Sequence, residues 1–182
     1  YYVNDAGRQI DILTASVYLR AIEIEDNIFP ESAYRGEYIK EIAKNANLQD
    51  AVNIDDLFKS LPEDDEEKID KIISHLKSAS EKDWKSIKKV SLESVLSTIE
   101  KDLEDFGVTF DNWFLESSLL GADSKIDAAV QQLNTNNLID NRDGNIWFKS
   151  SDFGDDKDRV LIRKDGRQTY FASDVAYHKD KL

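Results

Sequence analysis

The spacing of apolar residues changes along the chain, and each change predicts a different kind of element. Tyr1-Tyr2-Val3 is typical of the middle of a strand, and residues 10–22 place apolar side chains on two sides of a helix. A helix that is apolar on two sides is buried, as a crossover helix of an α/β sheet is. Asp5 can cap this helix, and Gly7 permits close packing near its start. The chain is therefore predicted to open with a strand and a buried helix.

Between about residues 23 and 107, apolar residues recur only at helical spacing. They form three stripes: Ile39, Ile42, Ala43 and Ala46; Ile69, Ile72, Ile73 and Leu76; and Leu92, Leu96, Ile99, Leu103 and Phe106. The third stripe repeats at nearly seven residues, which is typical of a seam between helices. This segment is predicted to be a small helical bundle.

From about residue 110 the pattern returns to strands. Phe110 to Phe114 is predicted as a strand, and a strand that follows a strand, a helix and a helical segment fits a parallel sheet. Residues 126–133 then have helical spacing. The apolar segments 138–139 and 146–148 flank Asn141-Arg142-Asp143-Gly144, which predicts a hairpin with a glycine turn.

The end of the chain is predicted to be a second hairpin that continues into a helix. Arg159 to Arg163 alternates apolar with polar residues, Lys164-Asp165-Gly166 supplies a turn, and Gln168 to Phe171 returns as a strand. Thr169 or Ser173 can cap the following helix. Helical spacing places four polar or aromatic side chains on one face, with Tyr170 close enough to face the same space: Asp174, Tyr177, His178 and Lys181.

The phenol of Tyr170 and the carboxylate of Asp174 are an unusual pair at the start of a helix. The helix dipole favours an ionised Asp174, while its free oxygens still need hydrogen-bond donors, which a cation would supply. A simpler interpretation makes Asp174 a helix-start residue and Tyr170 a strand aromatic. Residue types alone favour that simpler interpretation.

Composition narrows the classes of function. With 37 acidic and 24 basic residues, the chain has a formal net charge of −13, so we expect it to bind little nucleic acid by itself. It has no cysteine and only two histidines, which excludes thiolate and histidine-rich metal centres. No apolar stretch suits a membrane span or a secretory leader, so we expect a cytoplasmic protein. The absence of Met and the strand-like start predict an internal fragment of a longer protein.

Four separated stretches resemble the bacterial type of arginyl-tRNA synthetase, in the family's order. The last of them, residues 154–182, reads GDDKDRVLIRKDGRQTYFASDVAYHKDKL. Residues 1–9 resemble the family's strand-to-helix junction with its Asp-x-Gly-x-Gln core. Residues 34–39 resemble its Tyr-x-Gly-x-Tyr helix start, and residues 110–117 resemble its central strand. The resemblance covers the chain from end to end.

The resemblance implies an α/β fold that is part of a class I synthetase core. In that family a Rossmann-type parallel sheet is interrupted by a helical insertion and by a smaller α/β insertion. The chain would divide into five segments: 1–22, the first Rossmann strand and helix; 23–107, the helical insertion; 108–121, a core strand; 122–168, a helix with a β-hairpin insertion; and 169–182, a core helix with substrate-binding residues.

The resemblance also implies an activity and a site. The family activates arginine with ATP and Mg²⁺ and transfers it to tRNA(Arg), and its Tyr-x-x-x-Asp motif, here Tyr170 and Asp174, binds the arginine side chain. A carboxylate can accept two parallel hydrogen bonds from a guanidinium, which suits this role. The candidates for supporting the active site are Asp5, Gly7, Gln9, Glu116, Tyr177 and His178. No metal ligands are predicted.

The family's nucleotide-binding motifs, His-x-Gly-His and Lys-Met-Ser-Lys, are expected outside this chain, before Tyr1 and after Leu182. The chain alone is therefore predicted to be inactive. The alternative is a non-catalytic acidic helical module that binds a partner protein in a groove along its bundle. The enzyme interpretation requires the strand at Tyr1 and the strand at Phe110 to lie side by side and parallel.

Overall fold

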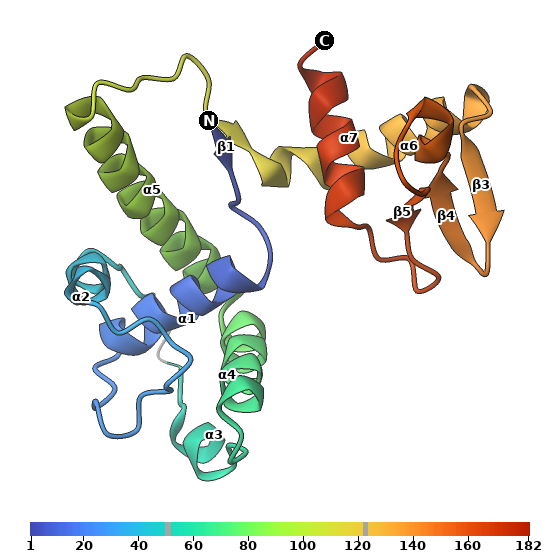
Figure 1. Cartoon of the computed structure of the whole chain (residues 1–182). Coiled ribbons are helices and arrows are strands. Elements are labelled where there is room, and N and C mark those ends of the chain that lie inside the picture. Colours follow the sequence, from blue (N-terminus) through green and yellow to red (C-terminus); the bar gives the residue numbers. More distant parts are fainter. Residues whose placement is uncertain (50–51, 122–123) are drawn as a thin grey trace. The chain divides into compact units, whose positions relative to one another are not determined.

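The computed structural model describes residues 1–49, 52–121 and 124–182, which form two compact units (Figure 1). The first, here called the strand unit, combines Tyr1–Asn4 with Asn112–Leu182. The second, the helical unit, is Asp5–Asp111. The helical unit is thus inserted into the sequence of the strand unit.

A parallel pair of short strands joins the two sequence segments of the strand unit. Strand β1 (Tyr2–Val3) pairs with β2 (Phe114–Leu115), with Tyr2 opposite Phe114. The backbone N–H of Phe114 also donates to the carbonyl oxygen of Tyr1 at 2.8 Å. The expected parallel neighbours are therefore confirmed. The predicted strand over 110–114 is shifted, because only its last residue lies in β2.

Three antiparallel strands form a second sheet in the order β3-β4-β5, comprising β3 (Ile139–Arg142), β4 (Asn145–Phe148) and β5 (Arg159–Ile162). The first hairpin is confirmed. Asp143 and Gly144 have φ values of 53° and 76°, and two central residues with positive φ form the type I′ turn that suits the twist of a hairpin.

The second predicted hairpin is wrong in its returning strand. Gln168 makes only an isolated bridge with Ile162, and helix α7 (Tyr170–Asp180) begins two residues later. The Thr169 side chain accepts a hydrogen bond from the backbone N–H of Ala172 at 3.3 Å, so it is the predicted cap. This cap starts the helix at residues whose aromatic side chains favour a strand.

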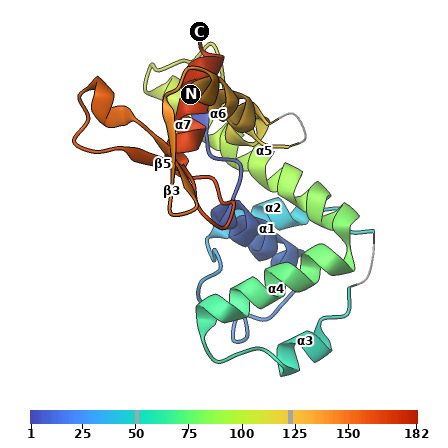
Figure 2. The same cartoon turned by 90° about the vertical axis from the view of Figure 1, so that its right-hand side faces the viewer.

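Two helices cover the core of the strand unit. Helix α6 (Lys125–Thr135) packs beside α7, and α7 also contacts β5 and the short 3₁₀ helix η1 (Glu116–Leu119) (Figure 2). A second 3₁₀ helix, η2 (Ser150–Phe153), follows β4. The buried core consists of Phe114, Leu119, Ile126, Ala129, Leu161, Ala172 and Ala176.

The helical unit is organised around its first helix, α1 (Arg8–Ala21), which is buried along most of its length, as predicted. Helices α2, α4 and α5 all contact α1 (Figure 1). Their bounds, with those of the short α3, are Glu37–Lys44 for α2, Asp55–Lys59 for α3, Asp65–Ala79 for α4 and Glu81–Asp105 for α5.

Two local predictions about this unit need correction. Asp5 is not the N-cap residue of α1, because Gly7, with φ 83°, occupies that position. The third apolar stripe is only partly buried: Phe106 is 88% exposed, and its other members, Leu92, Leu96, Ile99 and Leu103, are half-buried. The buried residues Trp84, Ile87 and Ser91 all lie in the first half of α5.

Helix α1 belongs to the same compact unit as the helices that follow it, whereas β1 belongs to the unit that contains residues 112–182. The five-segment division implied by the family resemblance places α1 with β1. That division remains a prediction. Among the described residues, no helix is long and apolar enough to cross a membrane.

Candidate functional site

The start of α7 positions the predicted Tyr170 and Asp174. Tyr170 is the first residue of α7 and Asp174 the fifth, so both lie on the same face, one turn apart. Asp174 therefore lies beyond the first turn, and the effect of the helix dipole on it is weaker than the sequence suggested. The Thr169 hydroxyl also donates to the carbonyl oxygen of Val160 at 2.6 Å, which ties this end of α7 to β5.

Both predicted arginine-binding groups are accessible. Tyr170 is 80% exposed and Asp174 is exposed. Within the described part of the chain, neither the phenol hydroxyl nor the carboxylate has a hydrogen bond or ion pair. The pair therefore presents one hydroxyl and two carboxylate oxygens toward a ligand.

A hollow of about 410 Å³ adjoins Tyr170 at the start of α7. Glu116 reaches it from the first position of η1, directly after β2. The remaining lining residues are Leu120, Arg163, Arg167, Gln168, Thr169 and Ser173. The structure therefore brings Glu116 and Tyr170, two of the predicted site residues, to one hollow within the strand unit.

The predicted supporting residues on α7 have different surroundings. The Tyr177 ring packs against the rings of Tyr2 and Phe114, with centroid distances of 4.7 and 4.6 Å. These contacts hold α7 against the parallel strand pair. His178 is exposed, and its Nδ1 lies 2.8 Å from the carbonyl oxygen of Asp174.

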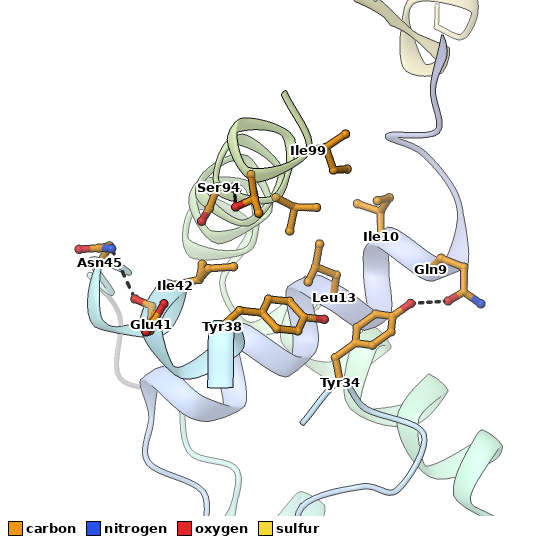
Figure 3. A pocket seen from close by; sticks show the side chains of 12 residues that line it. Gln9, Ile10, Leu13, Tyr34, Tyr38, Glu41, Ile42, Asn45, Ser94 and Ile99 are labelled. Carbon is orange, nitrogen blue, oxygen red and sulfur yellow. Dashed lines mark hydrogen bonds between the residues drawn. The ribbon is translucent and has the colours of Figure 1, made fainter. Parts of the chain in front are cut away.

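The other three supporting candidates lie in the helical unit. Asp5 is 4% exposed and Gly7 is the N-cap of α1. Gln9 lines a hollow of about 620 Å³ between α1, α2 and α5, where its Oε1 accepts a hydrogen bond from the Tyr34 hydroxyl at 2.6 Å (Figure 3). Tyr38 faces the same hollow. Two of the stretches that carry the family resemblance therefore meet at this hollow.

Two other acids of the strand unit, Asp155 and Asp158, are paired with arginines. A hydrogen bond from Arg159 lowers the pKa of Asp155 to about 2. Hydrogen bonds from Ser151 and Arg142 lower the pKa of Asp158. These carboxylates are ionised and paired, which makes them poor general acids and leaves them fewer free oxygens for a ligand.

The described residues contain no group of three or more His, Cys, Asp or Glu side chains placed to hold a metal ion. Sequence reasoning missed Arg163, Arg167 and Gln168 as neighbours of Tyr170. Their position near Tyr170 could have been inferred, because all three shortly precede α7 in the sequence. A returning strand over residues 168–171 was predicted instead of the start of a helix.

Comparisons with known proteins agree along the whole chain. A family model described as class I tRNA synthetases (R), catalytic domain, matches residues 1–182. An arginine–tRNA ligase of Acinetobacter baylyi is 43% identical, with alignment to 100% of this chain and 34% of the relative. One from Acidithiobacillus ferrooxidans is also 43% identical and aligns to 100% of this chain and 33% of its own length.

A crystal structure of a Campylobacter jejuni protein named as an arginyl-tRNA synthetase has the same fold over this region. Its TM-score is 0.69 at 34% identity, covering 100% of this chain and 35% of that protein. The chain thus spans about a third of the length of the curated relatives it matches.

Proposed function

Because the chain belongs to the catalytic-domain family of class I tRNA synthetases for arginine, we propose that it is part of an arginine–tRNA ligase. The complete enzyme would activate arginine with ATP and Mg²⁺ and transfer it to tRNA(Arg). Such an enzyme would work in the cytoplasm, where these substrates are found. The proposed role of this chain is to hold the arginine side chain through Tyr170 and Asp174.

The main support for the proposal is the exposure of the Asp174 carboxylate and its lack of a partner among the described residues. The carboxylate lies one helical turn from an exposed phenol, and Asp155 and Asp158, by contrast, are paired with arginines of the same unit. A substrate guanidinium can supply the missing donors in a planar fork. Each hydrogen bond to a charged group contributes about 1.5–3 kcal/mol.

This arrangement also explains how lysine and citrulline would be rejected. Lysine lacks the planar fork of donors, and citrulline lacks the positive charge. Either ligand would leave a carboxylate oxygen of Asp174 with a poorer partner than arginine supplies. Sites that hydrogen-bond a polar substrate group discriminate strongly against analogues that lack it, so we expect selection at binding.

The supporting roles remain proposals as well. Glu116 borders the hollow beside Tyr170, where it can bind a polar or cationic part of a substrate. Tyr177 would maintain the position of α7, and His178, Asp5, Gly7 and Gln9 remain proposed supporting residues. We propose that ATP phosphates and Mg²⁺ are bound by other parts of the enzyme, so the 182-residue chain alone would form no arginyl-adenylate.

The test is an Asp174→Asn substitution in the complete enzyme, assayed by ATP–pyrophosphate exchange and by arginylation with tRNA(Arg) present. We expect the KM for arginine to rise about tenfold or more, because 1.4 kcal/mol corresponds to a factor of ten. Discrimination against citrulline should fall. Asp180→Asn is the matched control, since Asp180 lies at the other end of α7 and pairs with Lys125. An unchanged arginine dependence of Asp174→Asn would refute the proposed role.

A further inference from the structure

Arg163 differs from every other arginine of the chain in its contacts. Within residues 1–49, 52–121 and 124–182, its guanidinium has no hydrogen bond, ion pair or ring contact. The six other arginines all have partners: Arg8 with Glu66 and Asp70, Arg20 with Asp26, Arg35 with backbone carbonyls, Arg142 with Asp140 and Asp158, Arg159 with Asp155, and Arg167 with Asp165. In a chain of net charge −13, Arg163 keeps its donors available.

The backbone of Arg163 is fixed although its side chain is free. Its N–H donates to the carbonyl oxygen of Arg167 at 2.9 Å, and its carbonyl oxygen accepts from Gly166 at 2.8 Å. The next residue is anchored too, since the Lys164 N–H donates to Oδ1 of Asn145 at 2.9 Å. The turn therefore holds the backbone of Arg163 in a defined position directly after β5.

Arg163 lines the hollow that also contains Glu116 and Tyr170. Arg167 lines it as well, but Asp165 accepts from Arg167 Nε at 2.8 Å and neutralises its charge locally. The hollow thus places a guanidinium that has no partner among the described residues beside Tyr170, whereas Asp174 is not among the residues that line it. A planar fork of donors binds phosphate oxygens in pairs.

We propose that Arg163 binds a phosphodiester near the 3′ end of the tRNA and so places the terminal ribose beside the bound arginine. This inference rests on the proposed function. Transfer requires that ribose to reach the carboxyl group of the arginine whose side chain Tyr170 and Asp174 would hold, and we expect the preceding phosphates to run within reach of Arg163. Arg163 is a positioning residue, because a phosphate contact fixes the register of a nucleic acid without reading its sequence.

The test compares Arg163→Gln with the wild-type complete enzyme in steady-state arginylation, varying tRNA, arginine and ATP in turn. We expect the KM for tRNA to rise about tenfold, with the KM values for arginine and ATP unchanged. The dependence of log KM for tRNA on log salt concentration should weaken by about one unit of slope. Arg163→Lys keeps the charge and should restore most of that slope.

Lys164→Gln is the matched control, because it removes the same charge from the adjacent residue, which is absent from the lining of the hollow. It should change the KM for tRNA less than twofold. An equal effect of both substitutions would mean a general charge effect and would overturn the proposal. A raised KM for ATP alone would assign the phosphate to the nucleotide, and a raised KM for arginine alone would assign Arg163 to the amino acid. Either result would also overturn it.

Failure of this inference can be told apart from failure of the proposed function. If the wild-type complete enzyme does not arginylate tRNA, the proposed function is wrong. If it does, and Arg163→Gln has the wild-type KM for tRNA and the wild-type salt dependence, only the role of Arg163 is wrong. Thermal unfolding of the variants should match the wild type, since the Arg163 side chain is exposed.

Discussion

Tyr2 lies opposite Phe114 in a parallel strand pair, and their rings stack with centroids 5.8 Å apart. The two residues come from opposite sides of the helical unit in the sequence. Tyr177 of α7 packs against both rings, so the strand pair and the helix of the candidate site share one aromatic cluster. The position of Tyr170 and Asp174 therefore depends on a contact between distant parts of the chain.

Replacing Phe114 with alanine should destabilise the strand unit selectively. Phe114 is 9% exposed, and truncation of a buried Phe costs about 3–5 kcal/mol. Hydrogen exchange in urea, followed in peptides from α7 and from α1, separates the two units. We expect faster exchange in α7 only. Phe153→Ala is the control, since Phe153 is largely exposed; loss of protection in α1 would contradict the division into units.

Tyr170→Ala should impair substrate binding without affecting stability. The side chain is mostly exposed, so the free energy of unfolding should stay within about 0.5 kcal/mol of the wild type. In the complete enzyme the KM for arginine should rise. Tyr177→Ala should do the opposite and mainly lower stability, because Tyr177 belongs to the aromatic cluster. A destabilised Tyr170→Ala enzyme with a normal KM would give Tyr170 a packing role instead.

Thr169→Ala should loosen the start of α7. It removes the cap on the Ala172 N–H and the hydrogen bond to the Val160 carbonyl oxygen. Loss of a Thr cap costs about 1 kcal/mol, and urea unfolding measures it. Thr169→Ser keeps the hydroxyl and should retain most of the stability. Equal losses in both variants would show that the methyl group matters more than the cap.

Asp65 should contribute stability that depends on pH. Burial opposes its ionisation, but hydrogen bonds from Ser32 and Glu31 and the contact with Lys68 outweigh burial and lower its pKa to about 2. A folded pKa below the unfolded value gives stability that is complete above about pH 4 and is lost as the pH falls toward 2. The contribution is on the order of 1–2 kcal/mol after solvent screening.

The measurement is the free energy of unfolding of wild type and Asp65→Asn between pH 2 and 6. The difference between them should shrink as the pH falls toward 2. Asp56→Asn is the control, because Asp56 forms an exposed ion pair with Lys59 and should contribute less than about 0.5 kcal/mol. A difference for Asp65→Asn that does not vary with pH would show that its charge is unimportant.

Local signals in the sequence predicted much of the structure. Asp143-Gly144 predicted a hairpin because few residues other than Gly, Asn and Asp accept positive φ, and both residues have it. Helical spacing predicted the helix that carries Asp174, Tyr177 and His178. The order of strand, helix, helical segment and strand predicted the parallel pair, because such a pair needs a long crossover.

Features that depend on contacts between residues far apart in the sequence could not be predicted from local patterns. The period of α5 showed that one face is apolar but not which of its residues are buried, and the core of the helical unit takes in Trp84 and Ile87. Tyr170 and Phe171 favour a strand, yet the cap at Thr169 starts a helix there. The sequence could not show that the Arg163 side chain has no partner among the described residues, because ion pairs depend on which acids lie nearby in space.

The insertion of the helical unit between β1 and β2 affects the order of assembly during synthesis. β1 leaves the ribosome before β2 and can pair with it only after residues 112–115 have followed. The helical unit can fold in the interval, since its core uses only its own residues. The chain leaves the strand unit at Asn4 and returns to it at Asn112, beside the same strand pair. Insertions and deletions within the helical unit can therefore accumulate during evolution without disturbing that pair.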